Sequence, residues 1–413
     1  MTTKNKQISS KFTPWFMWGC GAFFYFYQFI IKIAPSNLRE ELSFTFDLNA
    51  SNFGFLASFS LIAYTILQIP LGLWLSQWGS RRVLLWSIFL TSVGALVMGN
   101  APNFQVLCIG RLITGVGSAS AFIGAFKVAH DWFRPRALPV ITGITCSIGV
   151  IGASIGGVPI VLLNEYMGWR NSFMVVSILG MLFFLVFFMF FQDHPDSKAE
   201  KIKFIPAMKE IIASRQMWLL GAYGLALYTP VSVLADLWGP SFIKEAYNMS
   251  SVKAALISSF LYYGNATGSF VIGWIMRKFI SLRVFFATFA FMLTILITST
   301  VWLKFDNHNT VFAIFFTLGF LVACEGMVFP LGSQLVKAEN AALSAGSLNF
   351  VVTLGAAIFQ PLIGRIMDMF WEGLYKDGIP YYTTQNYQYG LTVLIVSIAI
   401  AIVLSFWIKE QKE

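Results

Sequence analysis

Residues 72–82 read GLWLSQWGSRR, a short basic turn between two long apolar stretches of the chain. Such a turn fits where two membrane-spanning helices meet water on the same side of a bilayer, because the hydrocarbon core offers non-helical backbone no partners. Gly72 and Gly79 permit the two helices to approach closely. Arg81 and Arg82 favour the cytoplasmic side, where membrane proteins concentrate lysine and arginine. The turn therefore predicts a helical membrane protein.

The composition supports this interpretation. Of the 413 residues, 57% are hydrophobic and 11% are charged, and the mean hydropathy is +0.70. A soluble globular chain carries roughly 25% charged residues. The net charge of +9 comes from basic residues scattered between apolar runs, without the basic stripe of a nucleic-acid-binding protein. We expect a polytopic membrane protein surrounded by lipid, with no nucleic-acid partner.

The sequence contains no cluster of metal-binding or catalytic residue types. The cysteines lie in or at the ends of apolar segments, and the histidines lie at segment ends: Cys20, Cys108, Cys146, Cys324, His130, His194 and His308. No nucleotide-binding loop accompanies them. The sequence therefore predicts no metal, no cofactor and no enzyme activity.

Apolar runs long enough to cross roughly 30 Å of hydrocarbon recur twelve times. They lie at 14–36, 52–75, 83–100, 104–129, 139–163, 172–191, 217–238, 254–276, 284–303, 311–333, 344–367 and 389–408. One long hydrophilic connection divides them six and six. The expected fold is an all-α membrane protein with twelve transmembrane helices in two pseudo-symmetric six-helix bundles. The expected parts are an N-terminal bundle (1–191), a cytoplasmic linker (192–216) and a C-terminal bundle (217–413).

The basic residues also predict the orientation. With the N-terminus inside, eighteen lysines and arginines fall in or beside cytoplasmic loops and five in outer loops. Both termini are therefore expected in the cytoplasm. The first apolar run is too long for a signal-peptide core and should stay attached as the first span.

The basic turn resembles the Gly-x-Leu-x-Asp-x-x-Gly-Arg-Lys/Arg signature between helices 2 and 3 of the major facilitator superfamily. Gly72, Gly79 and Arg81 match this signature, whereas Ser76 replaces its aspartate. Other stretches are similar to further motifs of the family: GRLITGVGSAS (110–120), HDWFRPRA (130–137), GWRNSF (168–173) and DLWGPSF (236–242). The resemblance covers the whole chain. It implies a secondary transporter that works by alternating access around a site at the bilayer midplane.

Two segments, FYFYQFIIKIAPSNL (24–38) and AYTILQIPLGLWLSQWGSRR (63–82), resemble the phagosomal nutrient transporters of intracellular bacteria. That branch imports amino acids or nucleosides, but sugar-phosphate permeases and lysosomal dipeptide transporters share several of the patterns. We expect proton-coupled import of a small polar metabolite, with an amino acid preferred, by a monomer in a bacterial inner membrane. The alternatives are an organic-anion or sugar-phosphate transporter, a dipeptide transporter and a non-transporting nutrient sensor.

Four residues are predicted to contact substrate: Tyr25, Gln28, Arg111 and Tyr228. The resemblance implies that helices 1, 4, 7 and 10 line the central cavity, and Tyr25 and Tyr228 occupy equivalent positions in helices 1 and 7. Both tyrosines could instead serve packing. Arg111 could instead hold helices 1, 2 and 4 together or extend to the membrane surface. Weaker candidates on the same grounds are Tyr262, Asn265 and Asn349.

Charged residues within apolar spans are costly and need a function or a partner. Glu325 lies near the middle of helix 10 and is the predicted proton-coupling residue, with simple ordering of the helix as the alternative. Lys32 lies 18 residues after Pro14 in helix 1 and Asp236 lies 19 residues after Met217 in helix 7, so both charges are expected at one depth, close to the outer surface. They are predicted to form an outer gate. Alternatively, each charge extends separately to the headgroups.

The basic turn is also the predicted inner gate, formed by Gly72, Ser76, Arg81, Arg82 and Asp131. In the family that the chain resembles, the aspartate of the signature helps to latch the two halves together in the outward-facing state. Ser76 carries no charge, so we expect a weaker latch in which Asp131 pairs with Arg81 or Arg82. The glycine-rich fifth span (139–163) is expected to permit close helix packing.

Overall fold

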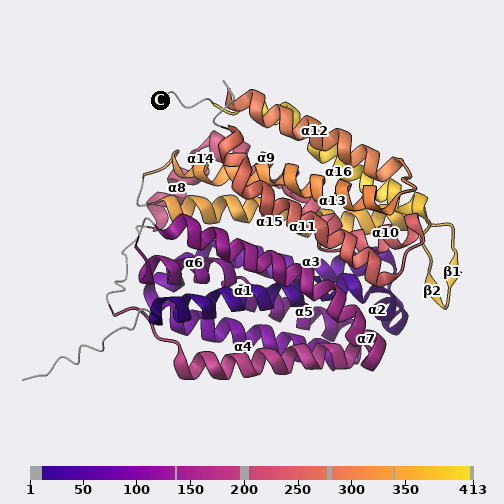
Figure 1. The fold of residues 1–413 in the computed structure, drawn as a ribbon, viewed down its shortest axis with the longest axis horizontal. Helices are drawn as coiled ribbons and strands as arrows, with labels where there is room; N and C mark the ends of the chain where they lie inside the picture. Colours follow the sequence, from indigo (N-terminus) through magenta and orange to yellow (C-terminus); the bar gives the residue numbers. More distant parts are fainter. Residues whose placement is uncertain (1–11, 135–136, 196–203, 277–280, 338–339, 410–413) are drawn as a thin grey trace, which may run out of the picture.

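The computed structural model describes residues 12–134, 137–195, 204–276, 281–337 and 340–409. Its helices run roughly side by side in one bundle (Figure 1). We name its two ends by what lies there. The tail face is where α1 begins and α16 ends, and the hairpin face, at the opposite end, carries the β1–β2 hairpin (Figure 1).

The N-terminal half forms the lower part of the bundle in Figure 1. Its elements are α1 (Thr13–Asn37), α2 (Arg39–Phe46), α3 (Ala50–Trp78), α4 (Ser80–Gly99), α5 (Phe104–Ser118), α6 (Ala121–Trp132) and α7 (Leu138–Phe190). The helix α7 contains two spans, because Gly168 turns the chain between them with a φ of +78°. Only glycine adopts that conformation at little steric cost.

The C-terminal half begins after the short connecting helix α8 (Phe204–Ala213). Its elements are α9 (Arg215–Pro230), η2 (Val231–Ala235), α10 (Gly239–Tyr247), α11 (Ser251–Met276), α12 (Leu282–Trp302), α13 (His308–Val322), η3 (Ala323–Met327), α14 (Val328–Ser333), α15 (Ala341–Met369), β1 (Tyr375–Lys376), β2 (Ile379–Pro380) and α16 (Thr384–Ser405). The two strands pair antiparallel in a small hairpin.

Within the described residues, ten helical segments have the length and hydropathy of a membrane span. One of them is α7, which supplies two spans, and the 26-residue α11 crosses the bundle beside them (Figure 1). The expected all-α fold of twelve spans is confirmed.

Glycines bring helices into backbone contact at two interfaces. In the fifth span, an added Cβ at Gly152 would lie 2.5 Å from the Phe26 carbonyl oxygen of α1, as the expected close packing requires. Between the two halves, a Cβ at Gly364 of α15 would lie 2.2 Å from the carbonyl oxygen of Ala50 in α3. These helices could not approach so closely with larger residues.

Three spans that the hydropathy pattern predicts to be continuous are interrupted. The fourth span breaks between α5 and α6, and the tenth passes through the 3₁₀ turn η3. The seventh contains the π-helix η2, in which Asp236 N donates to Val231 O at 3.0 Å and Trp238 N to Val233 O at 2.7 Å. The interruption follows Pro230, which has no N–H to donate. π-Helical turns of this kind are frequent at functional sites.

Candidate functional site

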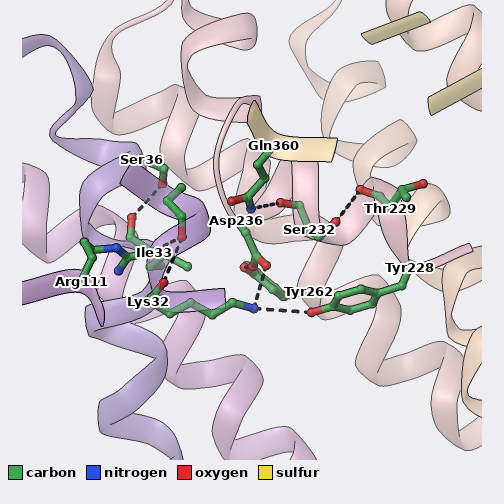
Figure 2. Close-up of polar contacts among 12 residues, drawn as sticks. Lys32, Ile33, Ser36, Arg111, Tyr228, Thr229, Ser232, Asp236, Tyr262 and Gln360 are labelled. Atoms are coloured by element: carbon green, nitrogen blue, oxygen red, sulfur yellow. Dashed lines mark hydrogen bonds and ion pairs between the residues drawn. The ribbon is translucent and has the colours of Figure 1, made fainter. Parts of the chain in front are cut away.

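An ion pair joins the two halves beside the interrupted seventh span. Lys32 Nζ of α1 lies 2.7 Å from Asp236 Oδ2, the residue that follows η2. The same ammonium donates to the Tyr228 hydroxyl at 3.4 Å, and Tyr262 of α11 donates to the Asp236 carboxylate (Figure 2). The Lys32 side chain keeps 19% of its accessible area, whereas that of Asp236 keeps 2%. The lysine is therefore the more accessible partner.

Hydrogen bonds from two other helices fix the π-helix that precedes Asp236. Gln360 Nε2 of α15 donates to the Ser232 carbonyl at 2.6 Å (Figure 2). Ser258 Oγ of α11 donates to the Leu234 carbonyl at 2.8 Å. A π-turn leaves carbonyl groups without their usual helical partners, so these donors satisfy them. The Asp236 carboxylate is consequently held on a supported segment of backbone.

Arg111 occupies a separate position on the other side of α1 (Figure 2). Its guanidinium group donates to the carbonyl oxygens of Ile31 at 3.4 Å and Ala57 at 3.5 Å, and the residue is 3% exposed. It thereby connects α1, α3 and α5, as the packing alternative predicts. It is near enough to Asp236 to interact electrostatically with it.

The remaining predicted contacts lie on α1 and α9. Tyr25 packs on Phe29 and Phe122 and lies within electrostatic range of Tyr228 and Asp236. Tyr228 contacts Lys32 directly. Gln28 is 5% exposed, one helical turn from Lys32. The structure therefore gathers both predicted tyrosines around the ion pair.

A polar network joins α3 to α15, and of its members Asn349 was a weaker predicted substrate contact, whereas Tyr64 and Gln68 were not predicted. Asn349 Nδ2 of α15 donates to Gln68 Oε1 at 2.9 Å, and Gln68 Nε2 donates to the Ala119 carbonyl at 3.2 Å, in the break of the fourth span. The Tyr64 hydroxyl lies beside both amide side chains and within electrostatic range of Lys32. The sequence offered one indication of this network: Tyr64 and Gln68 are polar residues four positions apart in an apolar span, and i and i+4 share one helix face.

Glu325 lies in η3, the interruption of the tenth span. Its side chain is partly accessible, and it is within electrostatic range of Tyr228. Because Tyr228 also contacts Lys32, one tyrosine lies between the carboxylate of the tenth span and the ammonium of the first. The predicted proton-coupling residue is thus next to the predicted substrate contacts.

A twelve-span bundle with charged residues in interrupted helices between two halves is a transporter arrangement. Residues 17–370 match the sequence profile of the Major Facilitator Superfamily. The chain belongs to this superfamily. Its members are secondary transporters of small molecules, so the chain is an integral membrane transporter and not an enzyme.

Curated relatives within the superfamily cover most of the chain. The hexuronate transporter of Bacillus subtilis (strain 168) is 23% identical, over 86% of this chain and 87% of its own length. The probable L-galactonate transporter of Escherichia coli (strain K12) is 24% identical, over 82% and 79%. The probable galactarate/D-glucarate transporter GudP of the same organism is also 24% identical, over 82% of each chain.

Solved structures share the facilitator fold. An inward-facing, unoccupied bacterial homologue of the human lysosomal transporter Spinster superposes with a TM-score of 0.80 at 16% identity, covering 96% of this chain and 97% of that one. A D-xylose–proton symporter gives a TM-score of 0.71 at 14% identity with the same coverage.

The hairpin face of this facilitator is closed by contacts between the halves. Arg39 of α2 donates to the Tyr387 hydroxyl of α16, and its guanidinium carbon lies 5.2 Å from the Trp238 ring centre and 5.3 Å from that of Tyr382. A cation surrounded by aromatic faces is held by their quadrupoles. The short helix α2 therefore attaches the N-terminal half to three rings of the C-terminal half.

A carboxylate from one half also caps a helix of the other. Asp368 of α15 accepts the backbone N–H of Ala50 at 3.1 Å and that of Ser51 at 2.8 Å, the first two residues of α3. The Tyr382 hydroxyl donates to the same carboxylate at 2.5 Å. An anion satisfies the unpaired N–H groups at a helix N-terminus and interacts favourably with the helix dipole.

At the tail face, the predicted inner gate differs from expectation. In the described chain, the Asp131 carboxylate pairs with Lys127 rather than with Arg81 or Arg82. The Arg81 guanidinium donates to the Phe188 carbonyl at 2.8 Å, and the Arg81 backbone N–H donates to Asp193 Oδ1 at 2.8 Å. The i, i+4 lysine is the nearer partner for Asp131, because both residues lie on one helix face.

The glycines of this turn have different roles. No atom of the described residues lies within 4 Å of a Cβ added at Gly72, so this structure does not bear out the expectation that Gly72 permits close helix approach. Gly79 adopts a φ of +82° and forms the turn, with Asp193 directly against it. Arg82 is exposed, and the side chain of Ser76 lies outside the described residues.

Proposed function

We propose that this protein imports an organic acid across a bacterial inner membrane, and that polyhydroxylated sugar acids are its substrate class. The observation that carries the proposal is an accessible ammonium, Lys32, between the two halves of a facilitator whose relatives are named for hexuronate, galactonate and glucarate transport. The amino-acid substrate preferred from the sequence has no support among these relatives. The organic-anion alternative is the better supported interpretation.

The two ends of such a substrate have matching groups in the site. Lys32 and the Tyr228 hydroxyl would bind the carboxylate through charge-assisted hydrogen bonds. Tyr64, Gln68 and Asn349 offer hydroxyl and amide groups that both donate and accept, as sugar hydroxyls require. Tyr25 would pack against the carbon chain.

Transport would proceed by alternating access with the hairpin face outside and both termini in the cytoplasm. The Lys32–Asp236 pair and the contacts of Arg39 and Asp368 close the hairpin face, and they would separate when that face opens. A pair that forms in one state and not in the other biases the equilibrium between them. Glu325 would carry the coupled proton, because a carboxyl group in an interrupted mid-membrane helix can bind and release one.

A thermal-shift screen of the purified protein tests the substrate class. D-glucuronate, galactarate and L-galactonate should raise the unfolding temperature, because a ligand that binds only the folded state stabilises it. Leucine, a dipeptide and a nucleoside should leave it unchanged. Lys32→Met should abolish the shift, whereas Lys253→Met, at a partly exposed lysine of α11 that contacts His308, should retain it. A shift with leucine and none with the acids would contradict the proposal.

A further inference from the structure

We infer that Asp236 takes the place of the substrate carboxylate on Lys32, so that substrate and Asp236 compete for one ammonium group. This inference rests on the proposed organic-acid function and adds a residue that sets substrate affinity. It assigns Asp236 a role beyond closing the hairpin face. In the substrate-free protein the Asp236 carboxylate occupies the anion site on Lys32, and it leaves Lys32 when a substrate binds.

The first argument concerns which cation a substrate can reach. Arg111 is 3% exposed, and its guanidinium group is engaged by the carbonyl oxygens of Ile31 and Ala57. Lys32 keeps 19% of its side-chain area, and its Nζ is also 5.2 Å from the Phe29 ring centre. Between these two cations of the N-terminal half, Lys32 is the one that an entering anion can contact.

The second argument concerns what Lys32 already binds. Asp236 Oδ2 lies 2.7 Å from its Nζ, and the Tyr228 hydroxyl lies 3.4 Å from it. A carboxylate and a hydroxyl on one ammonium are the two kinds of group that a hydroxy acid would offer. The internal ligands of Lys32 therefore have the chemistry of the proposed substrate.

The third argument concerns Asp236 after displacement. Its charged and titratable neighbours are Lys32 and Tyr25 of α1, Arg111 of α5, Tyr228 of α9 and Tyr262 of α11. Tyr262 donates to the carboxylate independently of Lys32, so a displaced Asp236 keeps one hydrogen bond. It loses its ion pair, however, and a buried charge without its pair is unfavourable. Substrate binding must offset this cost.

Removing the negative charge of Asp236 should therefore tighten substrate binding. The neutral variant Asp236→Asn is nearly isosteric and leaves Lys32 without an internal anion. A partly exposed ion pair contributes on the order of 1 kcal/mol, which corresponds to about fivefold in Kd. Net uptake by the same variant should fall, because the pair also helps to close the hairpin face.

The test is the Kd of D-glucuronate for the full-length protein in lipid nanodiscs, measured by isothermal titration calorimetry. Asp236→Asn and Asp236→Ser should each lower the Kd about fivefold relative to the wild type. Tyr262→Phe is the matched control, since it removes a hydrogen bond from Asp236 but keeps its charge, and it should not tighten binding. Adding Lys32→Met to Asp236→Asn should abolish binding.

The outcomes separate the two proposals. Wild-type binding with an equal or higher Kd in both neutral Asp236 variants overturns the competition between Asp236 and substrate, while the organic-acid function stands. Tightening in Tyr262→Phe to the same extent also overturns it, because the effect would then not depend on charge. Absence of sugar-acid binding in the wild type and in every variant contradicts the proposed function itself.

Discussion

At the scale of single residues, the position of the Lys32 charge depends on its contacts. Lys32 lies in an apolar span, and its ammonium contacts the Asp236 carboxylate, the Tyr228 hydroxyl and the Phe29 ring. A charge within a membrane span costs roughly 2.5–3.5 kcal/mol on insertion scales unless it finds such partners. Asp236 and Tyr228 come from the opposite half, whereas Phe29 lies on the same helix as Lys32, so the position of the ammonium depends on how the halves meet.

Exchanging the two charges tests whether the pair acts as an outer gate. Lys32→Asp and Asp236→Lys should each slow transport, because each places like charges together at about the distance now measured between opposite ones. The double exchange should recover much of the loss. Partial exposure limits the pair to about 1 kcal/mol, so the expected effect is a several-fold change in initial rate. Defects that simply add in the double variant would show that the two charges act independently.

Glu325 provides the second prediction at this scale. Glu325→Gln keeps the size and hydrogen-bonding capacity of the side chain in η3 but cannot bind and release a proton. The variant should no longer accumulate substrate against a gradient, whereas counterflow between preloaded and external substrate should continue. Radiolabelled counterflow and net uptake measured in the same vesicles distinguish the two. Accumulation equal to that of the wild type would rule out a coupling role.

Counting residues along helices 1 and 7 was enough to place Lys32 and Asp236 at similar depth, and the structure brings them into contact. The same approach did not find the Tyr64–Gln68–Asn349 network, because Gln68 and Asn349 are 281 residues apart and meet only when the halves pack. In this structure the Asp131 carboxylate pairs with Lys127 at i−4, and its pairing with Arg81 or Arg82 in the outward-facing state stays a prediction. Residue counting therefore gave the depth of two charges in equivalent helices, but it could not give the amide contacts between α3 and α15.

At the scale of helices, the sequence predicts where a span lies but not where the span is interrupted. Hydropathy located the fourth, seventh and tenth spans, because residues that face lipid and residues that pack between the helices are both mostly apolar. It could not locate η2, since a π-turn requires donors from other helices, here Gln360 and Ser258. Pro230 was a visible signal for this break, but a proline alone does not specify which carbonyls find new partners.

Gly239 offers a test of how rigidly the seventh span must be held. An added Cβ at this position would lie 1.8 Å from the Leu234 carbonyl oxygen, so Gly239→Ala must displace the backbone next to Asp236. Overpacking of this kind costs roughly 1–3 kcal/mol. We expect a lower thermal unfolding temperature and weaker D-glucuronate binding.

Gly273→Ala is the matched control, because no atom in the part of the chain that the structure describes lies within 4 Å of its added Cβ. In a helix that substitution should be neutral or stabilising. Equal unfolding temperatures for the two variants, measured by intrinsic tryptophan fluorescence, would show that the π-helix tolerates displacement.

At the scale of the whole molecule, the closed hairpin face follows from contacts that no single half contains. The cap on α3 comes from Asp368 of α15, and the rings around Arg39 belong to the C-terminal half. The twelve-span architecture was predictable from composition and hydropathy, but this arrangement of the two halves was not. The division of the chain at residues 192–216 stays a prediction.

Asp368→Ala should loosen the hairpin face, since it leaves two N–H groups of α3 without their carboxylate. A cysteine replacing Ser58, which is buried in the α3–α15 seam and donates to the Ala357 carbonyl, can report the opening. A membrane-impermeant maleimide should label it several-fold faster in Asp368→Ala than in the otherwise wild-type reporter. Asp377→Asn in the hairpin turn is the control and should not change labelling. An unchanged labelling rate in Asp368→Ala would remove this cap from the closing mechanism.

The central claim is that this facilitator carries sugar acids by means of Lys32, and uptake by reconstituted protein tests it most directly. Vesicles containing the wild-type protein, with an imposed proton gradient, should accumulate radiolabelled D-glucuronate, and collapsing the gradient should stop accumulation. Vesicles with Lys32→Ala should retain only the leak of empty vesicles, although the variant is folded. Sustained D-glucuronate accumulation by Lys32→Ala, or accumulation of leucine in place of the acid by the wild type, would contradict the account.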